Sequence, residues 1–315
     1  MMRLTLFALV LAAGCWAQTD GGIRTLKVQG YVYLLAGAGG NVAVQVGDDG
    51  VVVIDSGLAN RSDALIAAIR KLSPKPIRYV IDTNMHPEFI GGADNLRKAG
   101  VTITGANVAG NLTDAGEGAQ TIGHENLLNR VSAPTGKQAA YTFGFWPTQT
   151  YVTGQKELFF NEEPIEVKWM KNASTDGDSL VFLRRSDVIV TGDIMSTTSY
   201  PFIDVANGGT IEGEIEALNV IIDLAIPKHH EEGGTYVIPG HGRVCDQFDV
   251  VEYRDMVTIV RDRVRAAMKK DMQLEQIKRA GYTKDYDGRY NVPGTAVTAD
   301  AFIEAIYKTL APAKK

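Results

Sequence analysis

Two of the five histidines, His86 and His241, lie in short glycine-containing segments together with residues that could act on a bound ligand. Glu88 and a pair of glycines follow His86, while His241 lies between two glycines and Asp193 ends a Val-Thr-Gly-Asp segment. Imidazole nitrogen and carboxylate oxygen are donors that bind Zn²⁺, which lowers the pKa of a bound water and so promotes hydrolysis. A structural role is the alternative, with His86 as a polar loop residue and Asp193 as a turn cap.

Other chemistries find no support in the sequence. A nucleophilic serine of the hydrolase type would need a Gly-x-Ser-x-Gly elbow, and nucleotide binding a Gly-x-Gly-x-x-Gly or Walker-type loop after a strand; neither is present. The net charge is −5 and no run of five or six like charges occurs. Because binding phosphates requires a basic face, nucleic acid is not an expected partner. The expected partner is a small-molecule substrate or ligand.

Apolar runs separated by glycine, proline and aspartate predict the elements that position these residues. Strands are predicted over 27–36, 41–46, 51–54, 77–82, 101–105, 157–160, 165–170, 179–183, 188–191 and 235–239. Helices are predicted over 61–72, 92–99, 211–225, 250–270, 274–280 and 299–310. Hairpins open each half and helices follow, which indicates two packed sheets with helices outside.

Five short segments resemble, in order and spacing, the motifs of the metallo-β-lactamase superfamily. They are Val-Ile-Asp-Ser-Gly at 53–57, Thr-Asn-Met-His-Pro-Glu-Phe-Ile-Gly-Gly at 83–92, Ala-Ser-Thr-Asp-Gly-Asp-Ser at 173–179, Val-Thr-Gly-Asp at 190–193 and Ile-Pro-Gly-His-Gly at 238–242. The segments at 123–126 and 200–204 further resemble a periplasmic branch of β-lactamase-like hydrolases. The resemblance covers about residues 25–310 and implies one α/β (α+β) domain, an αβ/βα four-layer sandwich with C-terminal helices.

In that family seven positions bind two zinc ions, and the resemblance carries them onto seven residues here. The expected residue, or a longer carboxylate in place of Asp, stands at four of them: His86, Glu88, Asp193 and His241. Residues that bind zinc poorly or not at all replace histidine at the other three: Asn84, Phe89 and Ser174. Asp55 and Gly240 belong to the supporting frame of the family's site.

Two interpretations of this incomplete set stay open. In one, the dinuclear centre is lost, no metal is bound, and the chain is an impaired or non-catalytic relative that binds a small ligand or a partner in the old cleft. In the other, the four retained positions hold one Zn²⁺, or one Mn²⁺ or Fe²⁺, which activates water to hydrolyse an amide, lactam or ester. Glu88 and Asp193 would then be the catalytic residues.

Residues 107–155 form the least regular part of the sequence and contain a Phe-Gly-Phe-Trp segment at 143–146. These aromatic residues are expected either to line a substrate pocket or to plug the edge of the core. His124 is expected to cap or pack the start of a helix.

The N-terminus has the pattern of a signal peptide. A short positive start precedes a run of ten residues that is apolar except for Thr5 and is too short to span a bilayer. Small residues and a possible cleavage point after Ala17 follow this run. The predicted location is the periplasm or the outside of the cell, with lipid attachment at Cys15 as the alternative, and no membrane span is expected. Removal of the leader would leave Cys245 as the only cysteine and therefore no internal disulfide.

Overall fold

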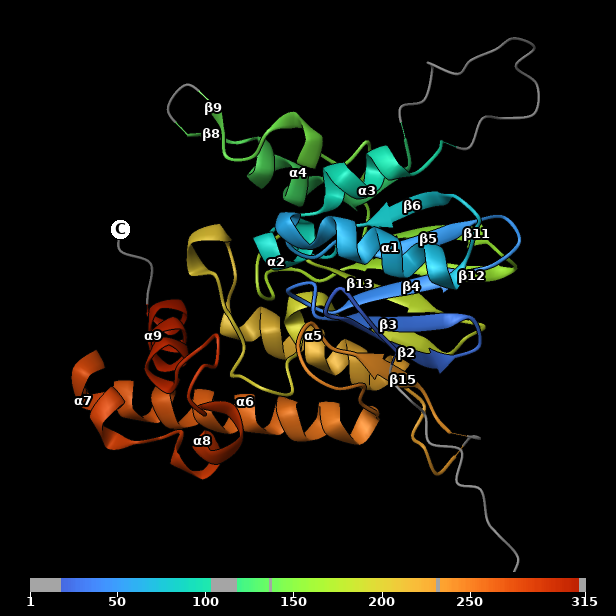
Figure 1. The fold of residues 1–315 in the computed structure, drawn as a ribbon. Helices are drawn as coiled ribbons and strands as arrows, with labels where there is room; N and C mark the ends of the chain where they lie inside the picture. The colour runs from blue at the N-terminus through green and yellow to red at the C-terminus, as the bar shows by residue number, and fades with distance from the viewer. Residues whose placement is uncertain (1–17, 103–117, 136–137, 231–232, 312–315) are drawn as a thin grey trace, which may run out of the picture.

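Two β-sheets pack face to face, and helices cover their outer faces (Figure 1). The computed structural model describes residues 18–102, 118–135, 138–230 and 233–311. The predicted fold class, a mixed α/β sandwich with C-terminal helices, is confirmed within this part of the chain.

The first sheet has eight strands in the order β1-β2-β3-β4-β5-β6-β7-β10. Their bounds are β1 Gln18–Asp20, β2 Ile23–Gln29, β3 Val32–Ala36, β4 Val42–Val46, β5 Val51–Ile54, β6 Ile77–Ile81, β7 Gln120–His124 and β10 Gln149–Tyr151. Strands β1 to β5 pair antiparallel, and β5, β6, β7 and β10 pair parallel. The four residues of β5 are all buried, which explains its continuous apolar sequence, since both faces of this strand are covered.

The second sheet has five strands in the order β11-β12-β13-β14-β15. Their bounds are β11 Gln155–Phe160, β12 Glu163–Trp169, β13 Ser179–Leu183, β14 Val188–Val190 and β15 Tyr236–Ile238. Only the last pair, β14 with β15, is parallel. A separate short hairpin joins β8 Pro134–Thr135 to β9 Gln138–Ala139.

Helices cover both outer faces of the sandwich. Their bounds are α1 Ser62–Leu72, α2 Pro87–Ile90, α3 Ala93–Ala99, α4 Glu125–Ser132, α5 Ile211–Leu224, α6 Gln247–Met268, α7 Leu274–Ala280, α8 Lys284–Tyr290 and α9 Ala299–Leu310. In Figure 1, α1 and α3 lie over the first sheet, and α5 and α6 lie over the second. One apolar cluster fills the space between the sheets and two others lie beneath these helical layers.

The functional segments follow parallel strands at one end of the sandwich. Asp55 follows β5, the segment 82–92 follows β6, Asp193 follows β14, and His241 follows β15. Because the carboxyl ends of parallel neighbours meet at one edge, these segments converge there. The C-terminal helices complete this end: the Tyr200 hydroxyl donates to Asp287 Oδ1 (2.9 Å) and lies 3.2 Å from Thr283 O.

Some predicted elements are wrong in detail. The single strand expected over 27–36 is a hairpin, because Gly30 adopts a positive φ of 53° and turns the chain between β2 and β3. Val101 and Thr102 belong to no strand, and the rest of the strand expected over 101–105 lies outside the described residues. Regular elements β7, α4 and β10 occur within the stretch expected to be irregular.

Two aromatic residues of the segment at 143–146 pack at the core edge, the second of its two expected roles, whereas Phe143 is 74% exposed. Phe145 and Trp146, with Tyr141, pack against an apolar cluster formed around α2, α3 and α4. His124 caps α4 as expected, its Nδ1 accepting a hydrogen bond from Asn126 N (3.2 Å).

The predicted leader lies outside the described residues, and no helix within them has the length and apolar character needed to span a bilayer.

Candidate functional site

Asp55 anchors the segment that carries most of the expected site residues. Its carboxylate accepts hydrogen bonds from Thr83 N (2.9 Å) and Thr83 Oγ1 (2.7 Å), which fixes the start of that segment. Burial raises the pKa of Asp55 to about 7, although the bonds from Thr83 act in the opposite direction. Asp55 therefore fixes the start of the segment that carries His86 and Glu88.

Asn84 links the same segment to the second sheet. Its Nδ2 donates to Asp178 Oδ1 (2.7 Å), and its Oδ1 accepts from His86 N (2.7 Å). Burial raises the pKa of Asp178 to about 7, partly offset by hydrogen bonds from Thr175. Both ends of the Asn84 amide are thus engaged within the protein.

His86 lies between two carboxylates. Its Nδ1 is 2.8 Å from Asp193 Oδ2 and its Nε2 is 3.1 Å from Asp204 Oδ2. The side chains of His86 and Asp193 are only 9% and 7% exposed. Burial alone would lower the pKa of His86, but the hydrogen bonds to Asp193 and Asp204 raise it to about 10. The hydrogen bond from His86 in turn lowers the pKa of Asp204 to about 2. An imidazolium with both N–H groups donating accounts for this geometry.

Ser174 completes the buried side of this cluster. Its hydroxyl donates to Phe202 O at 2.6 Å and lies 3.3 Å from Asp193 Oδ2. The Phe202 ring in turn lies against His86, with 4.8 Å between ring centroids. Ser174 therefore ties the segment at 200–204 to the cluster.

Phe89 occupies the space beside His241. The ring is fully buried and meets the His241 ring edge-on, with 5.5 Å between centroids. A Cβ atom at Gly40 or Gly240 would lie only 2.7 or 2.9 Å from carbons of this ring. The two glycines therefore make room for the phenyl ring, which is a structural reason for Gly240 at this position.

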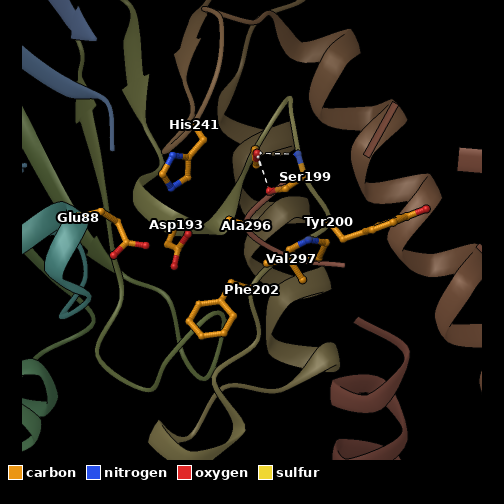
Figure 2. Close-up of a pocket in the computed structure, with 10 residues that line it drawn as sticks. Glu88, Asp193, Ser199, Tyr200, Phe202, His241, Ala296 and Val297 are labelled. Atoms are coloured by element: carbon orange, nitrogen blue, oxygen red, sulfur yellow. Dashed lines mark hydrogen bonds between the residues drawn. The ribbon is translucent and has the colours of Figure 1, made fainter. Parts of the chain in front are cut away.

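A cavity of 240 Å³ opens above these groups (Figure 2). It is lined by Glu88, Asp193, Ser196, Ser199, Tyr200, Pro201, Phe202, His241, Ala296 and Val297. Figure 2 shows Glu88, Asp193 and His241 around one hollow, with the Phe202 ring on its floor. Three of the four expected metal-binding positions thus face a common space, and the fourth, His86, is bonded to Asp193 beside it.

Sequence reasoning missed several residues of this site. Asp204 bonds His86, while Phe202 and Val297 line the cavity, yet none of the three was expected there. The segment at 200–204 matched a family branch, which was a signal that its aspartate belongs to the site. Val297 follows α8 in the C-terminal extension and carried no such signal.

Comparison with known proteins agrees with this architecture. A family model described as "Metallo-beta-lactamase superfamily" matches residues 35–241. The stereoselective inverting sec-alkylsulfatase Pisa1 from Pseudomonas sp. aligns with 90% of this chain at 16% identity and a TM-score of 0.62. The aligned part is 49% of the sulfatase, so the chain spans about half the length of that protein.

A metallo-beta-lactamase from Pontibacter korlensis aligns over 75% of this chain and 99% of its own, at 14% identity and a TM-score of 0.56. At these identities the structural likenesses show the fold alone. The match of the family model covers well over half of the sequence. The chain therefore belongs to the metallo-beta-lactamase superfamily.

Proposed function

We propose that this chain is a non-catalytic member of its superfamily that binds a small molecule in the cleft without the help of zinc. The observation that carries the proposal is the position of His86, whose two ring nitrogens are both taken up by carboxylates, Asp193 and Asp204. A metal-bound imidazole needs one nitrogen free of hydrogen as a lone-pair donor. His86 is instead placed as the cation of an internal ion pair.

The other expected positions support the same conclusion. The amide of Asn84 and the hydroxyl of Ser174 are neutral, weak donors for zinc, and both are engaged in hydrogen bonds within the protein. Phe89 presents hydrocarbon where the family has an imidazole. In the part of the chain that the structure describes, no three His, Cys, Asp or Glu side chains are grouped as a metal site requires. The donor set therefore does not fit the family's dinuclear zinc centre.

A second candidate function is a mono-metal hydrolase. It is favoured by one observation, that Glu88, Asp193 and His241 line the same cavity. Three protein donors suffice for a catalytic metal with one position open for water. This candidate needs these side chains to converge further than they do here.

Metal analysis tests the proposal directly. After incubation with Zn²⁺ or Mn²⁺ and removal of the excess, the protein is expected to retain less than about a tenth of an equivalent, because no complete donor set is present. The His241→Ala variant is the reference, since it removes one of the donors that line the cavity. Metal that this variant still retains is bound elsewhere, for instance by the exposed pair His229 and His230. About one equivalent in the wild type that is absent from His241→Ala would overturn the proposal in favour of the mono-metal hydrolase.

Restoring the family's ligands is expected to restore metal binding. The variant Asn84→His, Glu88→Asp, Phe89→His and Ser174→His should take up about two equivalents of zinc, because all seven family positions would then carry donors. Circular dichroism checks that the variant is folded, and metal content is measured by atomic emission. A folded variant that binds no metal would contradict the positional assignment on which the proposal depends.

A further inference from the structure

Three carboxylates at or beside the cavity share one cationic side chain. Asp193 and Asp204 share a single imidazole, that of His86, and Glu88 adds a third carboxylate. No lysine or arginine is among the ten residues that line the cavity. One histidine cannot neutralise three carboxylates in either of its protonation states, so carboxylates outnumber cations within this group of four side chains.

Glu88 is the carboxylate available to a ligand. Among the described residues it has no hydrogen-bond or ion-pair partner for its side chain, in contrast to Asp193 and Asp204. Its backbone is fixed, because Glu88 O accepts a hydrogen bond from Gly40 N (3.1 Å). Figure 2 shows its carboxylate pointing into the hollow toward Asp193. A half-buried carboxylate without a partner favours an occupant that donates hydrogen bonds and carries positive charge.

The remaining walls indicate that this occupant is organic. The Phe202 ring is 41% exposed and forms the floor, while Ala296 and Val297 close the side opposite Glu88 (Figure 2). An aromatic face attracts cations, and the apolar side chains suit a hydrocarbon group. The volume of 240 Å³ is below that of pockets for drug-sized ligands, which begin at about 300 Å³. The occupant is therefore small.

We propose that the cavity binds a small primary ammonium ion with a short apolar group. The ammonium hydrogens would point to Glu88 and Asp193, and the apolar group would lie on Phe202 and Val297. This inference rests on the proposed function, since a metal ion at Glu88, Asp193 and His241 would occupy the same space.

Benzylammonium and benzyl alcohol, which have the same shape and differ in charge, are suitable probes, with benzoate as the anionic counterpart. Isothermal titration at pH 7 and low salt is expected to give at least about tenfold tighter binding of benzylammonium than of the alcohol, since a hydrogen bond to a charged group is worth about that much. Glu88→Gln should weaken binding of benzylammonium about tenfold and leave the alcohol unchanged. The matched control is Glu216→Gln, which removes the same charge from an exposed position of α5 outside the cavity.

The outcomes separate this inference from the proposed function. Three results would each overturn the ammonium inference. They are no binding of benzylammonium up to about 10 mM, equally tight binding of the alcohol or of benzoate, and no weaker binding of benzylammonium to Glu88→Gln than to Glu216→Gln. None of these results would show that the protein binds a metal, so they would leave the proposed function unchanged. A full equivalent of metal in the wild type would overturn the proposed function, whichever probe binds.

Discussion

The His86→Ala variant is expected to lose about 3 kcal/mol of unfolding free energy, because breaking a buried ion pair leaves an uncompensated charge. Without the imidazole, Asp193 would keep the Ser174 hydroxyl, at 3.3 Å, as its only hydrogen-bond partner among the residues that the structure describes. Asp204 would keep its bonds from Asn207 but lose its cation. Urea denaturation followed by circular dichroism measures the effect. If His86 were instead a metal ligand without its metal, its substitution by alanine would change the unfolding free energy little.

The control for this variant is His229→Ala, which removes an exposed histidine far from the carboxylates in the sequence. Its unfolding free energy should stay within about 0.5 kcal/mol of the wild type, as is usual for surface changes. If His86→Ala is equally mild, His86 is not held as the cation of an internal ion pair. The observation that carries the proposed function would then fail.

The protein is expected to be most stable at about pH 4 and to lose stability steadily toward pH 10, because Asp55, Asp178 and His86 all have raised pKa values in the folded state. Burial raises the pKa of Asp55 and of Asp178 from 3.8 to about 7, so the folded state binds these protons more tightly than the unfolded state. Their contribution therefore falls as the pH rises from 3.8 to 7. For each carboxyl the difference is equivalent to about 4 kcal/mol, an order-of-magnitude figure.

Two further groups act at the two ends of the pH range. The pKa of His86, raised to about 10, gives stability that is complete below 6.5 and is lost as the pH rises through 10. The pKa of Asp204, lowered to about 2, gives stability that is present above 3.8 and is lost as the pH falls toward 2.

Urea denaturation at pH 5.5, 7 and 9 checks the prediction. Asp178→Asn should flatten the decline between pH 5.5 and 7, whereas Asp63→Asn, at an exposed position in the first turn of α1, should leave it unchanged. A wild type that is more stable at pH 9 than at pH 5.5 would contradict the assigned shifts.

Elements with a strong apolar pattern could be predicted from the sequence, and those held by tertiary contacts could not. The strand at 51–54 and the helices at 274–280 and 299–310 have the expected bounds. Helix α8 was missed because its sequence, Lys-Asp-Tyr-Asp-Gly-Arg-Tyr, has no apolar period. Its position depends on burial of Tyr290 and on the bond between Tyr200 and Asp287, neither of which is local.

Motif spacing predicted that the candidate residues lie together but not which hydrogen bonds they make. His86, Glu88, Asp193 and His241 do meet at one end of the sandwich, since each follows a strand whose position the family frame dictates. Asp204 was not predicted as a site residue because it lies on the long connection between β14 and α5, where no periodic pattern predicts the position of a side chain. The sequence alone left both interpretations of His86 open, because it did not place the Asp204 carboxylate beside this histidine.

The fully buried ring of Phe89 would make a metal site at this position harder to regain by substitution than to lose. Histidine at this position would put a smaller, polar ring into the fully buried space against Gly40 and Gly240, with a void beside it. Both faults would weaken the fold before any metal arrived to compensate. A lineage that had lost its metal would thus regain metal binding only through poorly folding intermediates, unless neighbouring positions changed first.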